Sequence, residues 1–313
     1  MVTSDGVAIR LRAPTPALAE LVVDYAFYDS GPAGSRARRN DYMPGLANLV
    51  LTFDAGPLRA AIRNHRLSWT DDAVVFGPTS HAFRVDSDGG RLIGIGITPL
   101  GWARLFGKHA ARVAYRVVPL STLWSADRAR RLHAALARAG SDEDAAVRSL
   151  DAMLSDALLP EGRDAELIRS LTALVHDPGS TDCAQAASRL GVAEAQVRRV
   201  AKHYFGFGPK LLLRRHRFMR AVAELTHRAP AELAAPLPDT PGVFSHYYDQ
   251  SHFIRDAHLF LGRTARQFGV TLTPIMAGIL TGRARRFGAP LQTLVTAGRD
   301  NLAPALRTDT DVA

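Results

Sequence analysis

The sequence contains a single cysteine, Cys183, among its 313 residues. One cysteine can form neither an internal disulfide nor a thiolate cage around zinc, so disulfide scaffolds and zinc fingers are excluded and a reducing compartment fits. Long apolar runs are also missing. The longest, residues 92–97, ends at Thr98 and Pro99, well short of the ~18–20 residues that a membrane helix needs. The chain opens without a basic stretch leading into an apolar one, so we expect no secretory signal, no membrane partner and a cytoplasmic location.

Lysine is scarce, and nearly all of the positive charge is carried by arginine. Only Lys108, Lys202 and Lys210 occur among 39 basic residues, and the net charge is +9. Residues 189–220 hold nine basic residues against one acid, Glu194, which gives this segment alone a charge of +8. A basic cluster of this kind favours a nucleic-acid partner. The alternative is a solvated helix face in an arginine-rich protein.

The order of the hydrophobic patterns predicts an α+β chain. Short runs rich in β-branched residues, at 46–53, 73–76, 81–85 and 91–97, are separated by Gly, Pro and Asp and predict a small β-sandwich or barrel. Helical periodicity follows at 127–138 and 144–159, and continues after a polar break at 160–164. We therefore expect an N-terminal β-rich domain with helices over 1–162, an all-α domain over 163–270 and a C-terminal extension over 271–313.

A helix-turn-helix is predicted over residues 183–200. Two helices that cross through a short turn need a small residue at their contact and a residue in the turn that tolerates positive φ; Ala187 and Gly191 fit these positions. Asp182 or Thr181 is placed to cap the first helix. The inward positions are all apolar: Ala186, Leu190, Val192, Val197 and Val200.

The second helix of this pair, expected over about 194–204, directs polar side chains away from the core. These are Gln196, Arg198, Arg199 and Lys202. Gln can pair with adenine and Arg with guanine in the major groove, whereas Lys and further Arg serve equally well as phosphate contacts. The sequence leaves open which side chain does which.

Three further motifs resemble those of AraC/XylS-family transcription regulators. Gly206, Pro209 and Arg217 lie at the spacing of the segment that opens the family's connecting helix. Residues 247–256 resemble its second recognition helix, with Ser251, His252 and Phe253 in the characteristic core. Gly262 and Thr264 resemble the closing motif. The match covers about 170–268, roughly a third of the chain.

The resemblance implies two helix-turn-helix units held by one connecting helix and inserted into successive major grooves of double-stranded DNA. It implies base contacts from Gln250, Ser251, His252 and Arg255, and for Arg215 on the connector a phosphate contact or a structural pairing. It also implies an N-terminal effector or dimerisation domain, often cupin-like, a small-molecule effector, a homodimer and RNA polymerase as a partner. Because the two helix-turn-helix units, here called reading heads, share one connecting helix, the second contact with DNA is effectively intramolecular once the first has formed.

The sequence departs from the family pattern mainly before the second recognition helix. Pro236, Pro238 and Pro241 forbid a continuous supporting helix there, and His246 stands where a turn glycine is usual. A left-handed conformation at a non-glycine residue costs about 1 kcal/mol. Recognition by this second unit is therefore expected to be the weaker of the two.

Two rival functions follow from the same residues. A DNA-tethered enzyme, such as a repair alkyltransferase, would need a reactive thiol in the N-terminal half, but Cys183 lies in the first motif, and no nucleophile elbow, phosphate loop or zinc-protease motif is present. The second rival function is that of a ligand-sequestering protein that has lost DNA binding. We therefore expect no enzyme activity and no cofactor. We also expect no metal, because the N-terminal histidines form no His-x-His pair. The N-terminal aromatics suit core packing or a ligand cavity.

Overall fold

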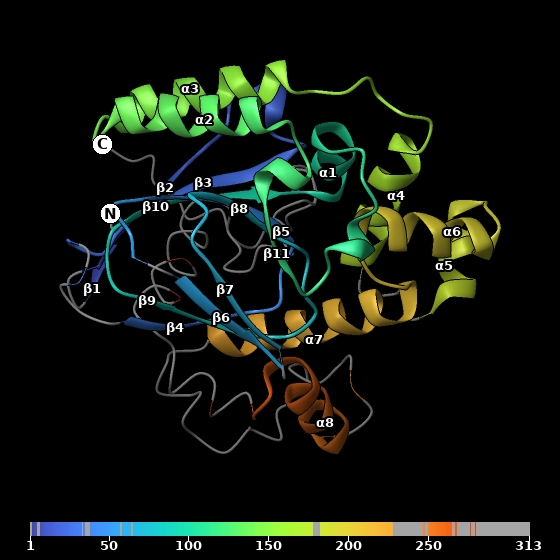
Figure 1. Cartoon of the computed structure of the whole chain (residues 1–313). Helices are drawn as coiled ribbons and strands as arrows, with labels where there is room; N and C mark the ends of the chain where they lie inside the picture. The colour runs from blue at the N-terminus through green and yellow to red at the C-terminus, as the bar shows by residue number, and fades with distance from the viewer. Residues whose placement is uncertain are drawn as a thin grey trace, which may run out of the picture.

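A computed structural model describes residues 2–4, 7–32, 34, 38–56, 58–63, 65–177, 182–227, 247, 250–264, 267, 276 and 279. Strands dominate the first part of the chain and helices the rest (Figure 1). The strands are β1 (Val2–Ser4), β2 (Val7–Arg12), β3 (Val22–Asp29), β4 (Arg38–Tyr42), β5 (Ala47–Phe53), β6 (Leu58–Ile62), β7 (His65–Trp69), β8 (Ala73–Phe76), β9 (Phe83–Ser87), β10 (Arg91–Ile97) and β11 (Val117–Pro119). The helices are α1 (Pro99–Leu105), α2 (Ala126–Ala139), α3 (Glu143–Asp156), α4 (Ala165–His176), α5 (Cys183–Leu190), α6 (Glu194–Val200), α7 (Pro209–His227) and α8 (Gln250–Leu261), with 3-10 turns η1 (Pro16–Leu18), η2 (Ala110–Arg112) and η3 (Leu120–Thr122) and a π-helical turn η4 (Ala201–Phe205).

Two antiparallel sheets form the N-terminal half, which confirms the predicted β-rich region. The larger has the order β1-β2-β3-β10-β5-β8-β11 and the smaller β4-β9-β6-β7. Side chains from both sheets meet in one apolar cluster, in which Leu58 and Trp69 of the small sheet contact Val74 and Phe76 of the large one. Alternation along the strands directs these residues inward.

Helices α2 and α3 cover one face of the seven-stranded sheet (Figure 1). Each begins at the side-chain cap that its sequence supplies: Ser125 accepts a hydrogen bond from the Arg128 amide, and Asp142 accepts one from the Ala145 amide. Leu132 and Leu150, within the apolar stripes of these helices, are fully buried. Among the described helices, none combines the length and apolarity needed to cross a membrane.

One hydrophobic core continues across the boundary expected at residue 162. It contains Tyr25 and Leu49 of the large sheet as well as Ile168 of α4, Val197 of α6 and Leu212 of α7. The polar break itself is held in place: the Leu159 amide donates to the Arg104 carbonyl (2.7 Å), the Arg104 guanidinium donates to the Leu159 carbonyl (2.6 Å), and Glu161 pairs with Arg169 (3.0 Å). The described helical part is therefore packed on the β-rich half as one body.

A second core joins α7 and α8 to the strands. Phe218 of α7 contacts Phe253 and Phe260 of α8, with ring centroids 5.5 and 5.3 Å apart, and the same cluster includes Ile9 of β2 and Met43. In Figure 1, α7 runs below the sheets and α8 lies beneath it, while α4, α5 and α6 gather at one end.

Candidate nucleic-acid interface

Helices α5 and α6 form the helix-turn-helix that the sequence predicts. Asp182 caps α5 by accepting a hydrogen bond from the Gln185 amide (2.9 Å), and Gly191 ends the helix at φ 63°. A residue with a Cβ would be strained at that left-handed angle, although nothing lies within 4 Å of the position that the Cβ would take. Ala187, Val197 and Val200 are buried at the contact. The local pattern alone is sufficient to specify this motif.

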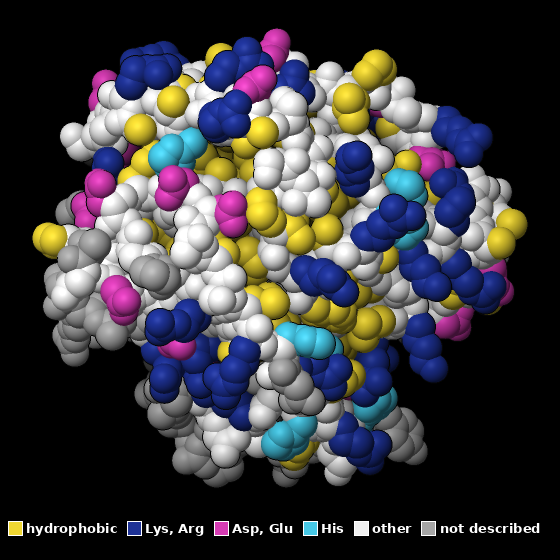
Figure 2. Space-filling model, in the orientation of Figure 1, with side chains coloured by type: hydrophobic (Ala, Val, Ile, Leu, Met, Phe, Trp, Pro, Cys, Tyr) yellow, Lys and Arg dark blue, Asp and Glu magenta, His cyan; other side chains and the backbone are white. Residues whose placement is uncertain are grey.

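The four side chains predicted to leave the core from the second helix all do so. Gln196, Arg198, Arg199 and Lys202 are exposed, the last on the π-helical turn η4 that extends α6. Arg198 pairs with Glu194 one turn earlier, a surface contact of small energetic value. Figure 2 shows Lys and Arg side chains gathered over the part of the face that Figure 1 labels α5 and α6, with histidines among them.

Arg199 has a carboxylate partner that sequence reasoning missed. Its two terminal nitrogens donate to the two oxygens of Asp164, at 2.7 and 2.6 Å, and the Tyr204 hydroxyl donates to the same carboxylate at 3.0 Å. The hydrogen bonds from Arg199, and secondarily from Tyr204, hold the pKa of Asp164 below its ordinary value. The sequence placed Asp164 in a polar linker, and only its position directly before α4 signals a structural role. The Arg199 guanidinium, which could otherwise pair with guanine, is bound to Asp164 in this arrangement.

Arg215 departs from the expectation of a surface phosphate contact. It is 1% exposed, and one terminal nitrogen donates to the Thr79 carbonyl (3.1 Å) and the Gly45 carbonyl (3.4 Å) of the N-terminal half. The other faces His216 Nε2 (3.2 Å), and the guanidinium lies over the Phe207 ring. Burial lowers the pKa of Arg215 to about 10. The structural pairing left open by the sequence is what the described structure shows, because α7 packs against the strands.

The second predicted recognition helix forms as α8. Ser251 and Arg255 are exposed, and His252 is half-buried with its ring edge-on to Tyr247 at 5.5 Å between centroids. Gln250 opens the helix. Phe253 is buried, as the aromatic of the motif requires for packing. Three of the four predicted contacts thus lie on or near one surface of α8.

A buried carboxylate, Asp256, fixes α8 to α7. It is 0% exposed and accepts hydrogen bonds from Arg214 Nε (2.7 Å) and from the Tyr247 hydroxyl (2.8 Å). Arg217 lies 3.8 Å from its second oxygen and stacks over the Tyr247 ring. Sequence reasoning missed Asp256. Its place five residues after Ser251, on the opposite side of the helix from the exposed set, was the available signal.

The N-terminal half also contacts the end of α8. The Ala82 amide donates to the Phe260 carbonyl (2.6 Å), and His81 Nδ1 lies 2.7 Å from the Leu259 carbonyl. The last carbonyls of a helix have no partner within the helix, so these donors satisfy two of them.

A shared carboxylate, Asp41, adds an ionic link at the same place. It pairs with Arg84 of β9 (2.8 Å) and with Arg263 just beyond α8. Burial alone would raise the pKa of Asp41, but the hydrogen bonds from the two guanidinium groups bring it below its ordinary value. Strands and second recognition helix are therefore held together by both neutral and charged contacts.

The proline-rich segment 236–241 and His246 lie outside the described residues, as does most of 271–313. The expectation of a weaker second unit therefore stays a prediction.

Two histidines, the half-buried His176 and the buried His216, link α4 and α7 and are expected to make the stability of the fold sensitive to acid. His176 and His216 lie edge-on at 5.0 Å between centroids, next to Arg215 and Arg220. Burial, and then the neighbouring arginines, lowers the pKa of His176 to about 4 and that of His216 well below its ordinary value. The folded protein therefore keeps both rings neutral at pH values where an unfolded chain would protonate them.

We expect the free energy of unfolding to fall as the pH falls from about 6.5 to about 4, because the unfolded chain binds protons first in this window. From the His176 shift alone the complete loss amounts to about 3 kcal/mol. Urea denaturation at a series of pH values measures it. In His176→Asn the fall should be smaller than in the wild type, whereas His258→Asn, which removes an exposed histidine of α8, should leave it unchanged. Equal pH dependence in all three proteins would contradict the assignment.

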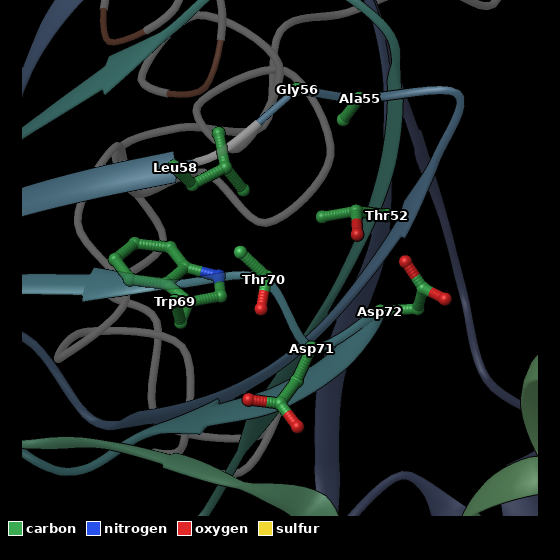
Figure 3. Close-up of a pocket in the computed structure, with 8 residues that line it drawn as sticks. All are labelled: Thr52, Ala55, Gly56, Leu58, Trp69, Thr70, Asp71 and Asp72. Atoms are coloured by element: carbon green, nitrogen blue, oxygen red, sulfur yellow. The ribbon is translucent and has the colours of Figure 1, made fainter.

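The β-rich half contains a hollow of about 210 Å³ at one end of the strands (Figure 3). Its walls are Thr52, Ala55, Gly56, Leu58, Trp69, Thr70, Asp71 and Asp72. Trp69 is 9% exposed, and its buried indole N–H has no hydrogen-bond partner among the described residues. In Figure 3 this nitrogen lies on the side of the ring toward Thr70, and the Asp71 and Asp72 carboxylates point in different directions. The lining therefore combines the apolar side chains of Leu58 and Trp69 with the polar side chains of Thr70, Asp71 and Asp72.

Among the described residues, no group of three or more His, Cys, Asp or Glu side chains is arranged to hold a metal ion. Cys183 is half-buried, and burial raises the pKa of its thiol, which makes it a poor nucleophile.

No family model and no curated protein matches the sequence. Among solved structures, the chain is similar to ToxT from Vibrio cholerae O395, with 13% identity and a TM-score of 0.42 over 76% of this chain and 98% of that one. A ToxT structure from Vibrio cholerae strain SCE256 described as bound to an unsaturated fatty acid gives 12% identity and a TM-score of 0.43, covering 84% and 98%. The AraC-like transcriptional activator CuxR gives 12% and 0.28, covering 70% and 88%.

Proposed function

We propose that the chain is a sequence-specific DNA-binding transcription regulator of the AraC/XylS type, without enzyme activity. The observation that carries the proposal is the helix-turn-helix α5–α6 with its π-helical extension η4. The apolar side of this unit is buried, and Gln196, Arg198 and Lys202 point outward. A helix of this width fits the major groove, and these side-chain types pair with base edges and phosphates. The basic segment 189–220 supplies the sequence-independent attraction to DNA phosphates.

The second reading head in this proposal is α8, with Ser251 and Arg255 outward. Its support is the ionic and aromatic contact with α7, because α7 also shares a hydrophobic core with α6 and a connector packed in this way fixes the separation of the two recognition helices. A fixed separation makes the second contact with DNA intramolecular.

The effector part of the proposal places a small molecule in the N-terminal half. The hollow beside Trp69 supports it, because its lining joins apolar side chains, Leu58 and Trp69, to two acidic residues, Asp71 and Asp72. The chain leads from the hollow to the helices through one strand: Asp72 directly precedes β8, and the loop after β8 contacts α7 through Thr79 and α8 through Ala82. A homodimer and RNA polymerase complete the partners that we propose.

We expect the full-length chain to bind duplex DNA with an affinity that falls steeply with salt, because the basic segment displaces counterions from phosphates. In a gel shift on a duplex selected from a random pool, Gln196→Ala and Arg198→Ala should each reduce discrimination by about 1–3 kcal/mol at particular base pairs. A matched control is Lys210→Ala, an exposed change on α7 that should weaken all sequences alike.

The same measurement separates the rival functions. A ligand-sequestering protein would bind no duplex at any salt concentration, and a DNA-tethered enzyme would change the DNA covalently, which mass spectrometry of the recovered duplex detects. Uniform loss of affinity on every sequence in Gln196→Ala and Arg198→Ala would show that α6 is not the reading helix.

A further inference from the structure

The segment 107–116, which lies in the N-terminal half between α1 and β11, packs directly against the end of the first recognition helix. The His109 and His203 rings lie 4.5 Å apart between centroids, so η2 contacts the π-helical turn η4. The neighbouring loop approaches just as closely: a Cβ at Gly206 would lie 2.5 Å from Pro78 Cγ. Gly206 has φ 86°, so both its angle and this contact require glycine. The N-terminal half and the recognition helix therefore share one continuous surface.

The backbone of this segment is firmly held. The Trp102 indole N–H donates to the Lys108 carbonyl (2.6 Å), and Trp102 is 1% exposed. Ala110 is fully buried, and the Val113 amide donates to its carbonyl (3.1 Å). A fixed backbone presents the side chains between these anchors in fixed places, which lowers the conformational entropy that a contact with a ligand would cost.

The exposed basic side chains of this held segment are Lys108, Arg112 and Arg116. Lys108 and Arg112 lie closest in the sequence to the His109 ring contact, and neither has a carboxylate partner within the described part of the chain. Other arginines of the same half are paired, for example Arg10 with Glu143 and Arg84 with Asp41. Unpaired cations gathered on one surface repel one another unless an anion covers them.

The position of these cations relative to the recognition helix is set by the stacked histidines. Lys108 directly precedes His109, and Lys202 directly precedes His203, so the Cα atom of each lysine is about 3.8 Å from the Cα atom of one of the two histidines in this contact. In Figure 2 the Lys and Arg side chains continue from the α5–α6 region toward the middle of the same face. The positive surface thus crosses from the helix-turn-helix onto the N-terminal half.

We propose that Lys108 and Arg112 bind DNA backbone phosphates beside the groove that α6 enters, so that the N-terminal half itself forms part of the DNA-binding surface. This inference rests on the function proposed above. When a recognition helix lies in the major groove, the groups at its rim face the sugar-phosphate backbone and fix register without reading sequence. Because the segment belongs to the β-rich half, any change in how the two halves pack would alter these contacts.

The alternative is that Lys108 and Arg112 are ordinary solvated residues of an arginine-rich surface. It predicts that any two exposed arginines act alike through net charge. Arg131 and Arg138, exposed on α2, provide the matched pair, since Figure 1 places α2 over the large sheet and away from α6.

The test compares full-length wild type, Lys108→Ala/Arg112→Ala and Arg131→Ala/Arg138→Ala. Fluorescence anisotropy measures affinity for a selected duplex and for a random one at several salt concentrations. Each lost phosphate contact reduces the slope of log K against log salt by about 0.9, so the first double variant should lose about 1.8 in slope and about 30-fold in affinity near 0.15 M salt. The loss should be equal on both duplexes, and ethylation interference should lose signals at phosphates next to the half-site read by Gln196.

Four outcomes overturn the inference. They are an unchanged slope in Lys108→Ala/Arg112→Ala, an equal loss in the α2 variant, a loss confined to the selected duplex, and unaltered ethylation interference beside that half-site. In each of them the wild type still binds the selected duplex in preference to the random one. If the wild type itself fails to bind, the proposed function falls and the inference falls with it, a result that is distinguished by the wild-type measurement alone. Thermal melting of the three proteins confirms that the exposed substitutions leave the fold intact.

Discussion

Arg215→Ala is expected to lower the free energy of unfolding by about 3–5 kcal/mol, as for removal of one partner from a buried polar network. The side chain is almost fully buried, and its loss would leave the carbonyls of Gly45 and Thr79 without their donor and open a cavity beside Phe207. Arg215→Met should cost less, because it keeps the volume and removes the desolvated charge. Urea denaturation measures both.

Lys210→Ala is the control on the same helix, since Lys210 is exposed and its removal should change stability by no more than about 0.5 kcal/mol. A stable Arg215→Ala protein that binds all DNA sequences more weakly would contradict the prediction. It would show that Arg215 contacts phosphate and leaves its interior site to do so.

Asp256→Ala should have the second large effect, about 3–4 kcal/mol, because it removes a buried carboxylate and leaves its cationic partner unpaired. The Tyr247 hydroxyl, also buried, would lose its acceptor as well. Relative to the wild type, Asp256→Ala should accelerate amide hydrogen exchange more in α8 than in α5, because α8 depends on this carboxylate for its contact with Arg214 of α7.

Ser251→Ala, an exposed change on α8, should leave exchange and stability nearly unaltered. If Asp256→Ala had as little effect on exchange and stability as Ser251→Ala, the aromatic contact among Phe218, Phe253 and Phe260 alone would hold α8 against α7. DNA binding distinguishes base reading by Ser251 from positioning of α8 by Asp256. Ser251→Ala should change base preference, whereas Asp256→Ala should weaken every contact that α8 makes with DNA.

Sequence reasoning succeeded where structure depends on neighbours in the chain. The cap at Asp182, the positive φ at Gly191 and the buried Ala187 are all determined within about ten residues, so the first motif could be predicted in detail. The strands at β5, β8 and β10 follow in the same way from short apolar runs and their turn residues. The outward direction of Gln196 and Arg198 follows from helical periodicity.

The sequence by itself determined the secondary structure around the recognition helices, the side chains that face outward and the clustering of positive charge. Only the tertiary structure decided which cations are free. Arg199 pairs with Asp164, 35 positions away, and Arg215 reaches a carbonyl 136 positions away. The physical reason is that periodicity specifies a face of a helix, whereas the occupant of that face depends on how distant segments pack. Packing of α4 and α7 on the sheets buries or pairs some arginines and leaves Lys108, Arg112 and Lys202 exposed.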